Sequence, residues 1–206
     1  MQVNITTTGE EKKTEVSNIQ STLGANFEIV KVLYDQPNRK YHNFGHILYM
    51  FDIAKQQGFK LNELQRLAIL YHDSIYVTSR KTDISNEIMS IKLAHSHLIK
   101  IIPKPALKLV CRMILDTKDH VPGIELSKEI IDLDLWILSE PEIIYEAYRK
   151  NIREEYSHLN DEEWKIARKD WLKKMFHRRT LYYTKNIEAV QALAERNLAK
   201  ELSGYS

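Results

Sequence analysis

The sequence has a single cysteine, Cys111, and few helix-breaking residues, with six glycines and five prolines among 206 residues. One cysteine excludes an internal disulfide framework and is typical of proteins in a reducing compartment. No apolar run approaches the roughly 20 residues of a membrane-spanning helix. Residues 1–13 also lack the apolar core of a signal peptide. We therefore expect a soluble, cytoplasmic protein with no membrane partner.

An excess of charge of one sign is also missing, because the formal net charge is only +2. A balance of this kind creates no global field that attracts nucleic acid or an anionic membrane. One basic cluster at residues 173–179 lies near Phe176, Tyr182 and Tyr183, a combination also seen in proteins that bind nucleic acid. We favour a solvated helix end for this cluster, since cations stabilise a helix C-terminus.

The hydrophobic pattern is helical almost throughout, and no segment alternates as a strand does. We predict a single all-α domain over residues 15–206, preceded by a loose polar segment over residues 1–14. It should contain about eight or nine helices. The predicted helices cover about residues 16–34, 43–57, 61–75, 85–102, 106–117, 126–138, 142–158, 160–176 and 187–202. Capping boxes are predicted at Ser139–Glu142 and Asn160–Glu163.

The helix ending at Tyr71 is apolar almost all round, which predicts burial, yet His72 and Asp73 follow at once. Burying an imidazole and a carboxylate without partners costs several kcal/mol or forces protonation of the carboxylate. Two arrangements would avoid this cost: a hydrogen bond between the two side chains, or a cation bound by both. Consecutive helical residues diverge by about 100°, so a shared ion has to lie between the two side chains.

Two further segments can supply ligands. His42 and His46 are one helical turn apart, although a lone histidine near a helix start is often a surface or satisfied core residue. Asp132 and Asp134 point to nearly opposite sides of a helix. Asp134 shares a stripe with apolar residues and therefore needs a partner, whereas Asp132 reads as solvated.

Nitrogen and oxygen ligands together suit a divalent ion such as Mn, Fe, Co, Mg or Zn, and they leave positions free for water or substrate. Because no thiolate is among them, a closed structural zinc site is not expected.

The order His46, His72-Asp73, Asp134 resembles the H…HD…D signature of the HD-domain metal-dependent phosphohydrolase superfamily. The flanking motifs strengthen the resemblance, and they match the branch described as predicted metal-dependent HD phosphohydrolases from about Tyr34 to Leu202. These motifs are Arg39-x-Tyr41-His42-Asn43-x-x-His46, His72-Asp73-x-x-Tyr76, Asn86-Glu87-x-x-Ser90, Thr117-x-x-His120, Asp132-x-Asp134-x-x-Ile137-Leu138, Ile152-Arg153-x-Glu155-Tyr156-x-His158, Arg178-x-x-x-Tyr182-x-Thr184 and Ala194-x-Arg196-Asn197-Leu198-x-x-Glu201-Leu202.

The resemblance implies an HD-type helical bundle in which His46, His72, Asp73 and Asp134 bind one divalent metal ion (Mn, Fe, Co, Mg, Ni or Zn). It also implies hydrolysis of a phosphate ester or anhydride, of a nucleotide or another small phosphate compound. HD proteins with two metals usually carry extra histidines after the HD pair. Asn86-Glu87 stands at the first such position, so we expect a single ion, although Glu87 or His120 can assist a second one.

Catalytic roles are assigned to three residues, each with an ordinary alternative. Arg39 either forks onto phosphate oxygens or makes a surface salt bridge. Glu87 is a general base or a carboxylate that orients a metal ligand, unless it merely stabilises a helix N-terminus. His120 is an acid or a substrate contact, or else part of an ordinary surface loop.

Substrate contacts are predicted for a further set, with Tyr156 alternatively in the core: His42, Tyr76, Arg153, Tyr156 and Arg178. Trp136, Trp164 and Trp171 are interpreted as core or interface packing. The stripe of the final helix can be buried in its own domain or across a homodimer, and both remain open.

Two other functional classes compete with a phosphohydrolase. A non-catalytic regulatory module would keep the metal site for structure or for sensing a nucleotide. An oxygen-using di-iron enzyme on the same scaffold is the third class.

Overall fold

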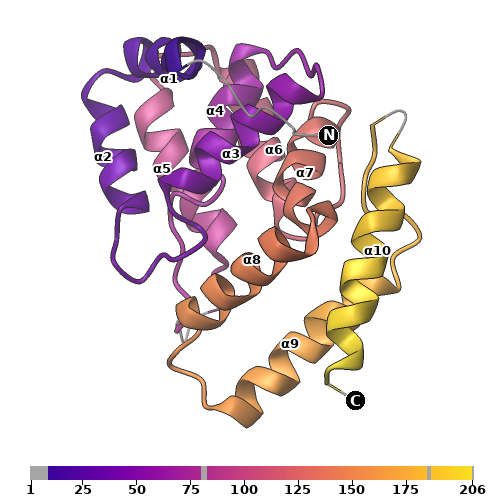
Figure 1. Ribbon diagram of the computed structural model, residues 1–206. Helices are drawn as coiled ribbons and strands as arrows, with labels where there is room; N and C mark the ends of the chain where they lie inside the picture. Colours follow the sequence, from indigo (N-terminus) through magenta and orange to yellow (C-terminus); the bar gives the residue numbers. More distant parts are fainter. Residues whose placement is uncertain (1–8, 80–82, 185–186, 206) are drawn as a thin grey trace.

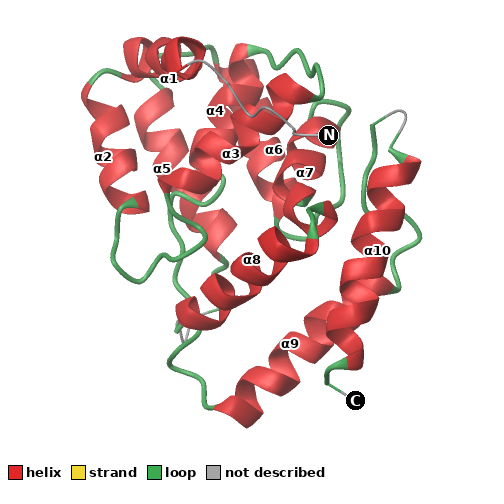
Figure 2. Cartoon of the chain, in the orientation of Figure 1, coloured by secondary structure: helices red, strands yellow, loops and turns green. Residues whose placement is uncertain are grey.

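The structure, a computed structural model, describes residues 9–79, 83–184 and 187–205 (Figure 1). In these residues the chain forms ten α-helices, one 3-10 helix and no strand, which confirms the predicted all-α class (Figure 2). In chain order the elements are α1 (Gly9–Leu23), α2 (Ala25–Tyr34), α3 (Phe44–Gln56), α4 (Glu63–Tyr71), α5 (Asn86–Leu98), α6 (Lys104–Thr117), α7 (Ser127–Asp134), η1 (Trp136–Ser139), α8 (Glu142–Glu155), α9 (Asp161–Phe176) and α10 (Glu188–Ser203).

The first predicted helix is in fact two helices, because the chain turns at Gly24. Its φ of 54° is a left-handed conformation that an L side chain would strain. Helix α1 also begins at Gly9, earlier than the predicted start near residue 16. The predicted loose segment falls largely on residues 1–8, which lie outside the described residues.

Capping explains where several helices begin. Asn160 and Glu163 form the predicted capping box of α9, and Asn62 and Gln65 form another at the start of α4. The predicted box at Ser139 is wrong. Ser139 is the last residue of the 3-10 helix η1, where its hydroxyl donates to the carbonyl of Trp136 at 2.8 Å, and Pro141 precedes α8 instead.

The core lies among α3, α4, α6 and α7, where Ile47, Met50, Leu67 and Met113 have no more than 1% of their surface exposed. Helix α10 packs on η1 and α9, with Ala194 and Leu198 fully buried, so its apolar stripe is covered by its own chain. None of the described helices has both the length and the apolar character needed to cross a bilayer.

A buried ion pair joins α9 to α10. The Arg168 guanidinium donates to both carboxylate oxygens of Glu201, at 2.9 and 3.0 Å, and the Tyr145 hydroxyl donates to the same carboxylate at 2.6 Å. Burial raises the pKa of Glu201, but Arg168 outweighs this effect, and the pKa lies below its ordinary value.

We expect Glu201→Gln to destabilise the fold by about 3 kcal/mol at neutral pH, since it leaves the buried guanidinium without its counter-ion. A carboxyl with a lowered pKa contributes stability above its unfolded pKa, and that stability is lost as the pH falls. The difference in unfolding free energy between the two proteins should therefore shrink below about pH 4.5. Chemical denaturation across pH measures it, with Glu188→Gln, exposed on the same helix, as the control. Equal stability of the two proteins at pH 7 would contradict the prediction.

Candidate metal centre

Four predicted ligands converge from three parts of the chain. His46 lies on α3, His72 and Asp73 follow α4, and Asp134 is the last residue of α7. One ligand atom from each of the four lies within 4.8 Å of all the others. Within the part of the chain that the structure describes, this is the one such group of histidine, cysteine and acidic residues.

The end of α4 explains how His72 and Asp73 reach the same point. The helix ends at Tyr71, not near residue 75 as predicted, although His72 still has helical dihedrals, with φ −56° and ψ −41°. Nδ1 of His72 lies 2.7 Å from the Ile69 carbonyl and donates to it. That contact turns Nε2 toward the cluster, 3.2 Å from Asp73 Oδ2 and 3.3 Å from Nε2 of His46. A hydrogen bond of this kind is what orients metal-binding histidines.

The choice between the two neighbouring aspartates is settled by their positions. Oδ1 of Asp134 lies 3.2 Å from Nε2 of His46 and 3.6 Å from Nε2 of His72, as predicted. The interpretation of Asp132 as solvated is wrong, since it is fully buried. Its carboxylate accepts hydrogen bonds from the backbone amides of Tyr183 and Thr184 and from the Thr184 hydroxyl.

The protonation states of the cluster fit a cation. Burial lowers the pKa of His46, which favours the neutral form that binds metal. Burial raises the pKa of Asp134, but its hydrogen bonds with His120, His46 and His72 outweigh this and hold the pKa well below its usual range. Burial lowers the pKa of His72, but Asp73 and Asp134 outweigh it and raise the pKa. The two carboxylates thus favour a positive charge at this point, such as a bound cation would supply.

Arg39 supports the cluster from behind and does not line the pocket in front of it. Only 4% of its surface is exposed, so the predicted surface salt bridge is wrong. Its guanidinium donates to the carbonyls of Asp73 at 2.6 Å, Ser74 at 2.9 Å and His42 at 3.1 Å. Because these donors are engaged with backbone oxygens, the predicted contact with phosphate is not formed by this arrangement. Arg39 fixes the backbone that carries Asp73.

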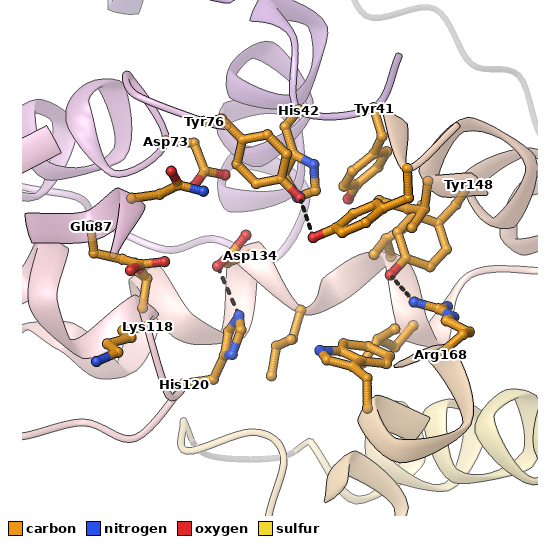
Figure 3. Close-up of a pocket in the computed structure, with 18 of the residues that line it drawn as sticks. Tyr41, His42, Asp73, Tyr76, Glu87, Lys118, His120, Asp134, Tyr148 and Arg168 are labelled. Atoms are coloured by element: carbon orange, nitrogen blue, oxygen red, sulfur yellow. Dashed lines mark hydrogen bonds and ion pairs between the residues drawn. The ribbon is translucent and has the colours of Figure 1, made fainter. Parts of the chain in front are cut away.

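Asp73 and Asp134 open onto a pocket of about 380 Å³ (Figure 3). Five other predicted residues also line it: His42, Tyr76, Glu87, His120 and Tyr156. Glu87 was predicted either to act in the site or to stabilise a helix N-terminus. It lies in the first turn of α5 and also faces the pocket, so its position fits both roles. His46 and His72 are not part of the pocket lining and are buried, with 3% and 1% of their surfaces exposed.

His42 has an acidic partner that the sequence analysis missed. Nδ1 of His42 lies 2.7 Å from Oε2 of Glu155, and the other carboxylate oxygen accepts from the backbone amides of Tyr41 and His42. Burial lowers the pKa of His42, but Glu155 outweighs it, and the pKa lies above its ordinary value. The ring of Tyr76 stacks on His42 with centroids 4.0 Å apart. His42 is therefore held rigidly at the pocket wall.

His120 adopts an unusual backbone conformation at the pocket edge. Its φ is 51°, a strained value for a residue with a side chain, and its Nε2 lies 3.3 Å from Oδ2 of Asp134. Arg178 stabilises this loop by donating to the carbonyls of Asp119 and His120, and the Tyr183 hydroxyl donates to His120 as well. Arg178 was predicted to contact substrate, but it lies outside the pocket lining and holds the His120 loop instead.

We expect Arg178→Ala to release this loop while leaving the four predicted metal ligands in place. Losing hydrogen bonds from a charged donor should lower stability by about 2 kcal/mol. Metal content measured by elemental analysis should stay at the level of the original protein, while the melting temperature falls. The neighbouring Arg179→Ala, at an exposed position, is the matched control. Loss of metal in Arg178→Ala would contradict this division of roles.

The positions of Arg153 and of the tryptophans correct one prediction and extend another. Arg153 lies outside the pocket lining and joins α8 to α9, donating to the carbonyls of Tyr156 and Leu159 and to Asp161. Trp136 is buried in the core and Trp164 and Trp171 pack against it, as interpreted, but these last two also line the pocket. An aromatic stripe on a helix looks the same in the sequence whether it faces a core or a cavity.

Comparisons with known proteins add no identification. No protein-family model matches the chain, and neither a curated protein nor a solved structure was found to be similar to it. Membership of the HD superfamily therefore stays a prediction that rests on the motifs.

Proposed function

We propose that this chain is an HD-type metal-dependent phosphohydrolase that cleaves a phosphate ester or anhydride of a nucleotide or another small phosphate compound. One observation carries the proposal: two buried histidines and two carboxylates present their ligand atoms within 4.8 Å, and the carboxylates face a pocket. When bound there, a divalent ion supplies a water of lowered pKa and neutralises phosphate charge.

The chain's own residues supply the remaining steps. His42, oriented by Glu155, presents its other ring nitrogen to donate a proton to the leaving oxygen, which is ordinary general acid catalysis. Glu87 and His120 lie across the pocket from the aromatic side and are placed to accept a proton from the attacking water or to position it. Positioning and charge neutralisation dominate phosphoryl transfer, so fixed side chains of this kind suit the reaction.

The test is release of phosphate and pyrophosphate from a panel of nucleotides and simple phosphoesters, with Mn²⁺, Mg²⁺ or Co²⁺ added. Metal-dependent release that Asp73→Ala abolishes is the expected result. A protein that binds metal and is stabilised by a nucleotide, but releases nothing from any compound, would instead be a regulatory binding module. Iron near two ions per chain would favour the di-iron enzyme.

A further inference from the structure

The pocket has two chemically different ends (Figure 3). At one end Asp73, Asp134, Glu87 and His120 gather around the metal centre, with Lys118 beside them. The other end lies between α8 and α9. Its walls are Tyr148, Ile152, Tyr156, Trp164, Arg168 and Trp171. A molecule that fills the pocket must therefore carry a group for a cation at one end and a flat, largely apolar group at the other.

The metal end of the pocket has little unpaired positive charge with which to bind a chain of phosphates. Two carboxylate ligands balance the charge of one divalent ion, and Glu87 faces the same space as Lys118. His42 is paired with Glu155, and His120 with Asp134. Sites for nucleoside di- and triphosphates surround the phosphate chain with glycine amides and several lysines or arginines. Among the described residues, the pocket lining contains no glycine, and Lys118 and Arg168 are its lysine and arginine.

Arg168 is not available as a phosphate clamp. Glu201 accepts from two of its nitrogens, and only Nη1 reaches toward the pocket, where it lies 3.4 Å from the Tyr148 hydroxyl. The guanidinium also stacks on Trp171, with its central carbon 4.5 Å from the ring centroid. This end of the pocket is therefore electrically balanced and has its aromatic rings fixed in place.

The aromatic end matches a planar ring. Trp164 and Trp171 are seven residues apart on α9, so they lie on one face about two turns apart. The ring of Tyr156 packs against that of Trp164 with their centroids 5.6 Å apart, and the ring of Tyr41 packs against that of Tyr148 with their centroids 4.7 Å apart. Aromatic side chains held this way are the usual platforms for nucleobases, because every base has a π-face.

We propose that the substrate is a phosphomonoester that carries one phosphate group and a flat, uncharged ring, as a nucleoside 5′-monophosphate does. This inference rests on the proposed function and narrows it. The phosphate lies at the metal centre and the ring lies between α8 and α9. Water adds to phosphorus, the bond from phosphorus to the ester oxygen breaks, and the proton lost by the water goes to that oxygen. The products are the free nucleoside and inorganic phosphate.

The test compares kcat/KM for four nucleoside 5′-monophosphates with kcat/KM for ADP, ATP and ribose 5-phosphate. We expect the best monophosphate to exceed ribose 5-phosphate by about 10–100-fold, as one base–aromatic stack provides. In Trp164→Leu and Trp171→Leu this ratio should fall about ten-fold. Trp136→Phe is the control, since that residue is buried outside the pocket and should leave the ratio unchanged.

A second readout does not depend on turnover. Quenching of tryptophan fluorescence by a nucleoside monophosphate should be lost when Trp164 and Trp171 are replaced, and should persist in Trp136→Phe. Phosphate release that is as fast from ribose 5-phosphate or ATP overturns the proposal but leaves the phosphohydrolase standing. Quenching without any release supports recognition of the ring and overturns the proposed hydrolysis. Neither quenching nor release overturns both.

Discussion

Asp73→Asn should reduce the metal content from about one ion per chain to nearly none, since each lost ligand weakens a site that has only four. The amide has almost the same size as the carboxylate, and Arg39 still binds the main-chain carbonyl of residue 73. The fold should therefore survive while the charge that attracts the cation is gone. Elemental analysis after dialysis against a weak chelator measures the loss.

Thermal unfolding gives an independent readout of the same site. A metal at 100 times its Kd stabilises the native state by about 2.7 kcal/mol, and Asp73→Asn should show no such shift. If the chain hydrolyses phosphate compounds, turnover should fall about a thousand-fold, since a bound ion contributes several kcal/mol to the transition state.

Asp132→Asn is the matched control, because it removes a carboxylate two residues from a ligand. The buried Asp132 holds the backbone at residues 183 and 184, so its substitution should lower stability and leave the metal content per folded chain unchanged. Full metal content in Asp73→Asn, or loss of metal in Asp132→Asn, would falsify the assignment of the four ligands.

Three of the four proposed ligands were predictable because each is a polar residue where the local pattern demands an apolar one, and His46 joined them through the resemblance to the HD signature. Asp134 stands on an apolar stripe, and His72-Asp73 ends an apolar helix. The same reasoning applied to Glu155, which continues the buried stripe of Tyr148 and Ile152, would have predicted that this carboxylate needs a partner, though not which residue supplies it. That signal was present in the sequence and unused. Periodicity alone sufficed for the all-α class.

The roles of the arginines were not predictable, because a guanidinium satisfies its donors equally well with carbonyls and with phosphates. Arg39 and Arg178 bind backbone carbonyls that are remote in sequence, and local pattern carries no information about such partners. The burial of Asp132 could not be predicted from its own segment for the same reason, since the segment that covers it lies about fifty residues further along the chain. Such partners meet only in the folded chain.

If the chain is a phosphohydrolase as proposed, Glu155→Gln should lower its turnover by about 100-fold, the smaller of the effects usually seen when general acid catalysis is lost. The glutamine keeps one oxygen for the backbone amides of Tyr41 and His42, so the local fold should remain. Its NH₂ group then faces Nδ1 of His42 and donates to it, which keeps the ring neutral with its proton on Nε2, a far weaker acid than the charged ring. Steady-state kinetics at saturating metal measures the fall in kcat.

The neighbouring Glu154→Gln, at an exposed position on the same helix, should keep kcat within about two-fold, since surface changes away from such contacts are usually small. Metal content should be normal in both variants, because neither residue belongs to the four-ligand cluster. The pair separates two roles for Glu155. If Glu155 only anchored the backbone, Glu155→Gln, which keeps that anchor, would leave both the melting temperature and kcat intact, and His42 would then not be the acid. A fall in kcat with normal metal content and a normal melting temperature would place the effect on the histidine ring itself.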